Sequence, residues 1–293
     1  MEDFVIKILV PLIFFVCNIF ASEKINVSVS VIPQSYFVKQ IAGDLVNVNV
    51  MVQKGKSPET YEPTIKQLQE LSNSKIYFGI GMPFEDAWLD RFKSVNPNMQ
   101  LIKPLPDGIL DKYNKKYDIN HHSHHEHSHD EHEHHNHPPH IWLSFELSKL
   151  HAKQIADTLI NINPKNTQIY KENLQNFIDK IDNLYNRFKI VFADSKKSFL
   201  VFHPAWNYIA NELGLSEYAI EEDGKEAKIA HRRDILEIIE KNNIKVMFIQ
   251  PQFSQKNALT IAKEAGIEVK LADPLSYDWL ESLEHFLNEI ANN

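Results

Sequence analysis

INVSVSVIPQSYFVKQIAGDLVNVNVMV, residues 25–52, carries the clearest secondary-structure pattern of the chain. Apolar and polar side chains alternate over residues 25–31, which predicts a strand, and Pro33 suits the first turn of a helix that runs to about Ile41. Residues 46–52 predict a second strand. The alternation continues with a helix at 64–71, a strand at 75–80 and a helix at 83–95. Strands that alternate with helices of this length predict parallel βαβ units in a doubly wound sheet.

A second series of alternating elements begins near residue 199 and predicts a second α/β lobe. Its expected elements are a strand at 199–203, helices at 205–213 and 233–242, a strand at 245–249, a helix at 255–265, a strand at 268–271 and a last helix from 277 to the end.

A long helix is predicted between the two series. Residues 164–195 begin with Pro164, contain no other proline and no glycine, and repeat apolar side chains at three- and four-residue spacings. Such a helix is about 45 Å long at ~1.5 Å per residue, and it should restrict hinge motion between the lobes. We therefore expect an α/β fold of two doubly wound parallel-sheet lobes, joined by one long rigid helix, with a cleft between them. The expected division is a signal peptide at 1–21, an N-terminal lobe at 22–163, the linking helix at 164–195 and a C-terminal lobe at 196–293.

The length, composition and net charge of the chain limit the classes of protein to which it can belong. The chain has 293 residues, of which 43% are hydrophobic, so it can bury two cores. Its formal net charge of −8 argues against nucleic-acid binding, which needs a basic face.

The N-terminus predicts export. Residues 8–20 form an apolar run that is too short to span a bilayer of ~30 Å as a helix and has the length of a signal-peptide core. We expect cleavage after Ala21 and a periplasmic protein, in preference to a lipid anchor on Cys17, because the residue before that cysteine, Val16, is larger than such sites usually carry. The mature chain would then contain no cysteine, so any metal site must use histidines and carboxylates.

Ten histidines lie within residues 121–137, in the run HHSHHEHSHDEHEHHNH. Imidazole is a borderline-soft ligand for Zn²⁺, Cu²⁺ or Ni²⁺, so the tract predicts auxiliary, weak metal binding. The run has no hydrophobic periodicity and is expected to be a solvated loop of the N-terminal lobe; a plain polar spacer is the alternative. The histidines concerned are His121, His122, His124, His125, His127, His129, His132, His134, His135 and His137.

Four further residues follow strands or lie in loops of different βα units: Glu59 in GKSPETYEPT, His140 in PPHIWLS, His203 in FHPAWNYIA and Asp273 in ADPL. Ligands of α/β sheets gather outside the carboxyl ends of the strands, so residues there can converge from distant parts of the sequence. One nitrogen or oxygen donor from each of four loops, two in each lobe, predicts a small-cation site in the cleft.

Each of the four has an alternative interpretation. Glu59 could be an acid at the N-terminus of the helix at residue 64, and His140 the tail of the tract. His203 could be a histidine satisfied in the core, and Asp273 an N-cap or turn residue before Pro274.

Five segments, in their order along the chain, resemble the metal-binding solute-binding proteins of ABC importers, specifically the zinc-binding ZnuA-type branch. They are GKSPETYEPT, HIWLS, FHPAWNYIANELGL, IQPQFSQKNALTIAKEAG and LADPLSYDW. The resemblance covers essentially the whole mature chain. It implies two lobes joined by a rigid helix, a metal buried between them, and delivery to a membrane permease that works with a cytoplasmic ATPase. A monomeric receptor without enzymatic activity is expected.

Glu59 departs from this resemblance, because family members usually carry a histidine directly after the proline. The remaining set of two imidazoles and two carboxylates is like that of the manganese-binding branch, yet carboxylate also binds Zn²⁺. We favour Zn²⁺ because the tract and His203 both indicate a preference for nitrogen ligands. The alternatives are a Mn²⁺ receptor of the same family, a periplasmic zinc store or chaperone, and a secreted zinc hydrolase. The hydrolase is disfavoured because no predicted helix carries HExxH and no GxSxG turn occurs.

Deletion of residues 121–137 should lower the number of bound Zn²⁺ ions and remove weak binding while sparing one tight site. A disordered ligand loses chain entropy of ~1–2 kcal/mol per fixed residue on binding, so tract sites should be weaker than a preformed cleft. Calorimetric titration of both proteins with Zn²⁺ measures this difference. Loss of the tight site on deletion would instead show that a tract histidine belongs to it.

Overall fold

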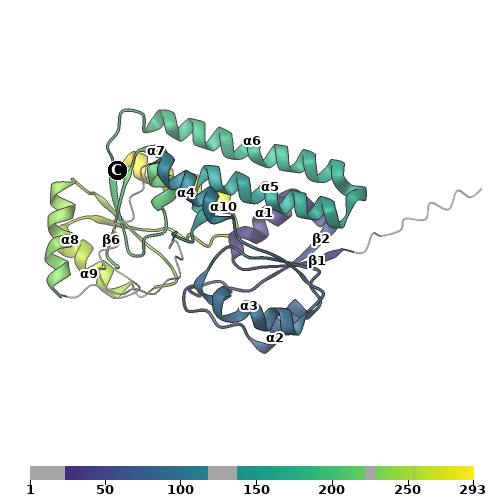
Figure 1. Ribbon diagram of the computed structural model, residues 1–293. Coiled ribbons are helices and arrows are strands. Elements are labelled where there is room, and N and C mark those ends of the chain that lie inside the picture. The colour runs from purple at the N-terminus through teal and green to yellow at the C-terminus, as the bar shows by residue number, and fades with distance from the viewer. Residues whose placement is uncertain (1–23, 118–136, 222–228, 254) are drawn as a thin grey trace, which may run out of the picture.

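The computed structural model describes residues 24–117, 137–221, 229–253 and 255–293 (Figure 1). The predicted signal peptide and all tract histidines except His137 lie outside the described residues. Within the described part, no helix combines the length and apolar composition that a bilayer crossing requires.

The N-terminal lobe is a four-stranded parallel sheet with the strand order β2-β1-β3-β4. Its elements are β1 (Ile25–Val29), α1 (Ile32–Ala42), the 3₁₀ turn η1 (Gly43–Leu45), β2 (Val46–Val50), α2 (Ile65–Ser72), β3 (Ile76–Phe78), α3 (Pro83–Val95), β4 (Gln100–Ile102) and α4 (Asp107–Lys116). All of β3 and the last three residues of β1 are buried, as is typical of central parallel strands covered by helices on both faces.

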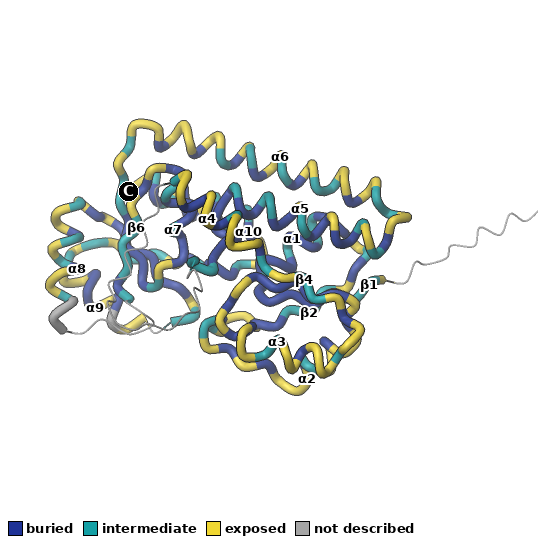
Figure 2. The backbone as a smooth tube through the Cα atoms, in the orientation of Figure 1, coloured by how far each residue is buried: buried dark blue, intermediate teal, exposed yellow. Residues whose placement is uncertain are grey.

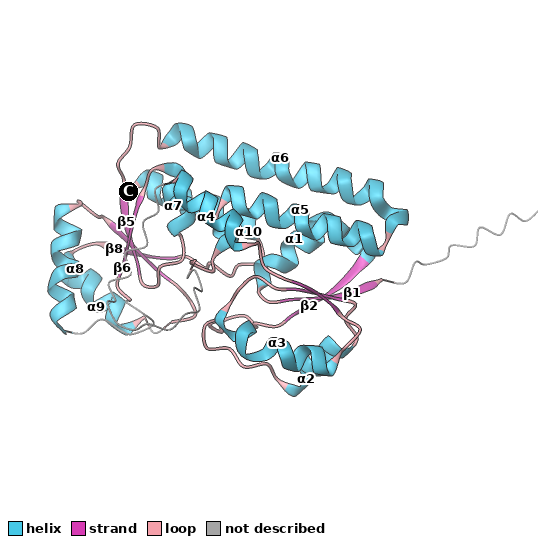
Figure 3. Cartoon of the chain, viewed as in Figure 1, coloured by secondary structure: helices cyan, strands magenta, loops and turns pink. Residues whose placement is uncertain are grey.

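The C-terminal lobe repeats this topology, with a parallel sheet in the order β6-β5-β7-β8. Its elements are β5 (Ser198–Val201), α7 (Asn207–Leu213), β6 (Ser216–Ala219), α8 (Ile229–Lys241), β7 (Val246–Ile249), α9 (Lys256–Ala265), β8 (Glu268–Leu271) and α10 (Trp279–Asn292). Figure 3 shows the strands as two separate groups, one in each lobe. The predicted fold class, with two doubly wound parallel-sheet lobes, is confirmed.

A pair of long helices connects the lobes. After the 3₁₀ turn η2 (Ile141–Leu143), α5 (Phe145–Ile162) and α6 (Thr167–Val191) run side by side, joined by the short turn η3 (Pro164–Asn166). The long helix predicted at 164–195 is thus present but shorter, because its first residues form the 3₁₀ turn and it ends at Val191. Figure 2 shows α6 exposed along its outer face and buried on the face toward α5.

Two helices were missed by the sequence analysis. Ser144 is the N-cap of helix α5, since its side chain accepts a hydrogen bond from the Leu147 backbone N–H. The helix ends before Pro164. Helix α4 lies before the histidine tract, in a segment for which no element was predicted, and it packs Tyr113 into the core.

One hydrophobic cluster spans both lobes, and a second lies within the C-terminal lobe. Residues of both sheets, together with α1, α5, α6 and α10, belong to a single cluster of buried apolar side chains. At its centre, the Trp142 indole donates a hydrogen bond to the Pro274 carbonyl at 2.7 Å, and the Trp279 indole donates to the Trp142 carbonyl at 2.8 Å. These two bonds join the lobes where both indoles are buried.

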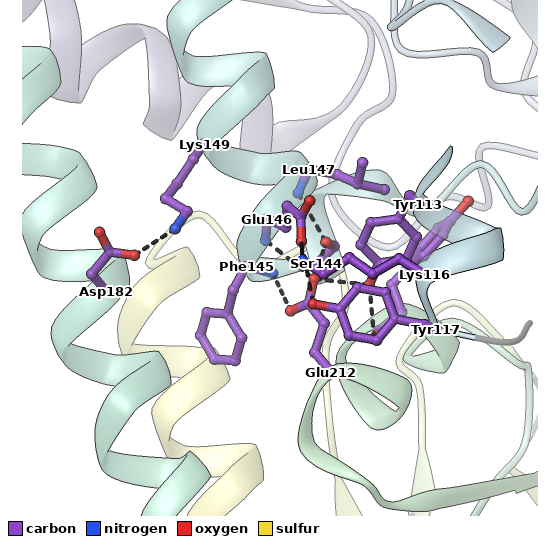
Figure 4. Close-up of polar contacts among 11 residues, drawn as sticks. Tyr113, Lys116, Tyr117, Ser144, Phe145, Glu146, Leu147, Lys149, Asp182 and Glu212 are labelled. Atoms are coloured by element: carbon purple, nitrogen blue, oxygen red, sulfur yellow. Dashed lines mark hydrogen bonds and ion pairs between the residues drawn. The ribbon is translucent and has the colours of Figure 1, made fainter. Parts of the chain in front are cut away.

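A buried carboxylate makes a second connection between the lobes (Figure 4). Glu212 of α7 accepts hydrogen bonds from the Phe145 amide at 2.7 Å, the Ser144 hydroxyl at 2.5 Å and the Tyr113 hydroxyl at 2.8 Å. Burial raises the pKa of Glu212 despite these donors. Because its carboxylate lies at the N-terminus of α5, the amides and the dipole of that helix stabilise it where water cannot.

His151 of α5 is fully buried. Its Nε2 lies 3.2 Å from Nε2 of Gln34 and its Nδ1 lies 3.2 Å from Oε1 of Gln154. An amide nitrogen donates and an amide oxygen accepts, so the pair of contacts fits a neutral ring protonated at Nδ1. Burial accordingly lowers the pKa of His151 to about 4.

This histidine should make the protein less stable in mild acid. In the unfolded chain this side chain binds a proton below pH ~6.5, whereas in the folded chain its pKa is about 4. Stability is therefore lost as the pH falls between these two values. Between pH 7 and pH 5 the loss is about 2 kcal/mol. Urea unfolding at both pH values should show a smaller difference for His151→Leu than for the unchanged protein. His285→Leu, at an exposed position, should behave like the unchanged protein, and an equal pH effect in all three would contradict the assignment.

Candidate metal centre

Glu59 lies in the extended loop that follows β2, not at the end of a helix. Helix α2 is capped by Thr64, whose side chain accepts a hydrogen bond from the Gln67 amide, and no acidic residue occupies its first turn. The alternative of a helix-end acid therefore has no support. The Ser57 hydroxyl contacts one carboxylate oxygen of Glu59 and leaves the other, Oε1, to face His140 and His203.

His140 is the last residue before η2 and is 5% exposed. Its ring packs edge-on against Trp142, with the centroids 5.3 Å apart. Since the indole of Trp142 is itself held by Pro274 of the other lobe, the position of the His140 ring depends on the contact between the lobes.

His203 follows β5, next to β7, at the point of the C-terminal sheet where the strand order reverses. Three side chains hold it. The Gln250 amide accepts from the His203 backbone N–H at 3.2 Å and donates to its carbonyl at 2.6 Å. The Phe253 ring stacks on the imidazole with a centroid distance of 5.0 Å, and Glu221 Oε2 lies 3.0 Å from its Nδ1. The contact with Glu221 directs Nε2 toward the cleft, as the carboxylate partner of a zinc-bound histidine does.

The three side chains converge on one point between the lobes. His140 Nε2 lies 3.4 Å from His203 Nε2, and Glu59 Oε1 lies 3.2 Å from His203 Nε2 and 3.7 Å from His140 Nε2. A tetrahedral ion with bonds of ~2.0–2.1 Å separates its ligand atoms by about 3.3–3.4 Å. Among the described residues these three form a group with all donor atoms within 4.8 Å of one another, so they are placed to bind a single ion.

The charges at this point also suit a cation. Burial alone would raise the pKa of Glu59, but hydrogen bonds from His140 and His203 and the charge of His203 hold that pKa well below its usual range. Burial lowers the pKa of His140, which favours the neutral ring that metals bind. At His203 burial is outweighed by the hydrogen bonds to Glu221 and Glu59, and the pKa is raised to about 9. Without metal, a proton on His203 therefore supplies positive charge that a bound metal ion would replace.

Asp273, the fourth predicted ligand, follows β8 and lies outside the three-residue group. Its Oδ1 accepts hydrogen bonds from the Gln252 side-chain amide at 2.7 Å and from the Leu275 backbone N–H at 3.0 Å. The second of these bonds is a turn interaction of the kind expected for an aspartate before a proline. Its predicted role as a ligand stays a prediction.

Of the tract histidines, the structure describes His137, which lies beside α4. Its Nδ1 is 2.9 Å from the Asn114 side-chain nitrogen, and its Nε2 is 3.2 Å from Asp111 Oδ1. The other nine lie outside the described residues, so the predicted weak binding stays a prediction.

The residues that hold His203 were not identified from the sequence. Gln250 and Phe253 lie directly after β7, the strand beside β5. The rule that ligands gather where the strand order reverses would have indicated this loop once the order was known. Glu221 follows the short strand β6, which the periodicity did not reveal.

The chain is similar to proteins of zinc uptake. A model of the family described as "Zinc-uptake complex component A periplasmic" (ZnuA) matches residues 27–293. The zinc-binding lipoprotein AdcA of Streptococcus pneumoniae strain R6 is 28% identical over 264 residues, which cover 87% of this chain and 51% of AdcA. The chain thus spans about half the length of the first curated relatives that it matches.

Two solved structures share the whole fold. A crystal structure of ZnuA superposes with a TM-score of 0.78 at 34% identity, covering 92% of this chain and 99% of that one. A ZnuA deletion mutant with zinc bound gives a TM-score of 0.77 at 33% identity, covering 92% and 98% of the two chains.

Replacement of Glu59 tests whether its carboxylate binds the metal. Glu59→His should raise the preference for Zn²⁺ over Mn²⁺ by about tenfold, because imidazole is the softer donor and carboxylate oxygen suits Mn²⁺ better. Competition binding with both metals measures the ratio. Glu62→His places the same substitution at an exposed position of the same loop and should leave the ratio unchanged. An unchanged ratio in Glu59→His as well would remove Glu59 from the site.

Proposed function

The chain belongs to the ZnuA family of zinc-uptake components, and from this premise we propose that it is a periplasmic receptor that binds one Zn²⁺ ion tightly and delivers it to the permease of an ABC importer. The ion is the cargo of the receptor. Glu59, His140 and His203 are its proposed ligands, and the cytoplasmic ATPase of the importer is the proposed source of energy. We propose that the receptor acts as a monomer, exported by the segment at 1–21.

The convergence of Glu59, His140 and His203 between the lobes is the observation that carries this proposal. His140 and His203 are 63 positions apart in the sequence, and Glu59 and His203 are 144 positions apart. Their donor atoms nevertheless lie within 4.8 Å of one another. A satisfied core histidine would not need an acid and a second imidazole at these distances. Two imidazoles and one carboxylate form a set that Zn²⁺ binds readily.

A zinc hydrolase would need an open coordination position with a general base beside it. Among the described residues, Glu221 is an acid in contact with a proposed ligand, and it already pairs with His203 Nδ1 on the side of the ring that faces away from the other two ligands. This position suits a residue that orients a ligand and not one that activates a water. We therefore propose binding and transfer without catalysis.

A store or chaperone would bind metal mainly through the tract. The preformed site between the lobes favours the receptor instead, because its donors are already within range of a single ion. The Mn²⁺ receptor remains the second candidate, favoured by the carboxylate at position 59.

Replacement of His203 tests the proposal. His203→Ala should abolish tight Zn²⁺ binding and leave the circular dichroism spectrum unchanged, because the side chain contributes to the site and not to either core. In cells that encode the protein, deletion of its gene should lower accumulation of radioactive Zn²⁺ at limiting zinc. The unchanged gene should restore uptake and the His203→Ala gene should not.

His285→Ala is the matched control, since that histidine is exposed on α10 and should support full uptake. Restoration of uptake by His203→Ala would refute the site, and an uptake defect for Mn²⁺ with normal Zn²⁺ uptake would favour the manganese receptor.

A further inference from the structure

The small cavity beside the proposed metal ligands is lined by one polar side chain that is not among those ligands. Apart from Glu59, His140 and His203, the cavity is lined by Gln252 and by apolar residues, with a volume of about 10 Å³. This is room for about one water-sized guest. The Gln252 side chain is the polar group of this lining that belongs to no proposed ligand.

The orientation of the Gln252 amide is determined by Asp273. The Gln252 Nε2 donates to Asp273 Oδ1 at 2.7 Å, and a carboxylate can only accept, so the amino group must face Asp273. The carbonyl oxygen Oε1 therefore points away from Asp273. This oxygen is buried and has no hydrogen-bond partner among the described residues. A buried carbonyl without a partner costs free energy, unless a ligand satisfies it.

The loop that carries Gln252 is held in place on both sides. Gln250 binds the backbone of His203 through two hydrogen bonds, and Phe253 stacks on its ring. Gln252 lies between these two residues, so it is placed together with a metal ligand.

We propose that the carbonyl oxygen of Gln252 supplies the fourth interaction with the bound Zn²⁺, and that Asp273 is the positioning residue that orients it. This inference rests on the proposed function, since it names the fourth donor of the same site. It gives Asp273 an indirect role in place of the direct coordination expected from the sequence. An uncharged amide oxygen completes the tetrahedron without adding a second negative charge, which favours an ion that must later be released to the permease.

Conservative variants separate the two roles of Asp273. Asp273→Asn keeps an oxygen that can accept from Gln252 and Leu275, so Zn²⁺ affinity should stay within about twofold of the unchanged protein. Asp273→Ala removes that acceptor and should weaken binding by about 10–100-fold, the usual effect of losing a group that orients a metal ligand. Gln252→Leu, which keeps the size of the side chain but not its oxygen, should weaken binding by the same factor. The double variant Gln252→Leu/Asp273→Ala should be no weaker than either single variant.

Affinity is measured for the tightest site by competition between the protein and a chromogenic chelator for Zn²⁺, and melting curves verify that each variant is folded. Co²⁺ bound in place of Zn²⁺ adds a spectroscopic test. Its visible absorption should change in Gln252→Leu and Asp273→Ala and should be preserved in Asp273→Asn.

Two results would overturn the inference. Equal loss of affinity in Asp273→Asn and Asp273→Ala would show that the carboxylate itself binds the metal. Unchanged affinity and an unchanged Co²⁺ spectrum in Gln252→Leu would show that its oxygen takes no part; if that variant does not fold, the comparison of the two Asp273 variants decides alone. In either case, the proposed function would stand if the unchanged protein binds Zn²⁺ tightly and His203→Ala does not. Absence of tight Zn²⁺ binding in the unchanged protein would refute the function itself.

Discussion

The buried contact between the lobes at Trp142 and Trp279 is the constraint on which the metal centre depends. The Trp142 indole binds the Pro274 carbonyl, next to Asp273, and Trp142 lies two residues after His140. A shift of one lobe against the other that separated His140 from His203 would therefore also break buried hydrogen bonds. Burying two indoles with their N–H groups satisfied stabilises one relative placement of the lobes.

Helices α5 and α6 extend this constraint along the molecule. They pack against α1 of the first lobe, and α6 also contacts α10 of the second. Glu212 joins α7 to the first turn of α5, so the segments that follow His140 and His203 are tied to each other as well. The proposed site is thus already held in position by the fold, so that little ordering free energy would be lost on binding an ion.

The chemistry of the centre follows from this placement. On a surface, water would screen the electrostatic interactions of an acid and two imidazoles. In the partly buried cleft these interactions are stronger. Glu59 and Glu221 lie on opposite sides of the His203 ring and both favour positive charge there. A divalent ion at the proposed site would satisfy Glu59 and both imidazoles at once, which a proton cannot do.

Much of the fold was predictable because local sequence patterns determine it. Alternating βα units, the long apolar-striped helix and the proline and glycine positions specified two parallel sheets and their connection. Helix α5 was missed although Ser144 and its apolar periodicity indicate a helix, and α4 was missed because a ten-residue helix beside a histidine tract gives a weak pattern.

Local sequence also indicated Glu59, His140 and His203 as members of one site, since each follows the end of a strand or enters an apolar segment. Their mutual distances, and the placement of Asp273 against Gln252 instead of within the group, depended on tertiary structure. The reason is physical: periodicity and turn chemistry act over a few residues, whereas the separation of donor atoms is decided by how two sheets and a pair of helices pack across a shared core. The partners of His203 come from β6 and β7, strands that become its neighbours only through the order of the folded sheet.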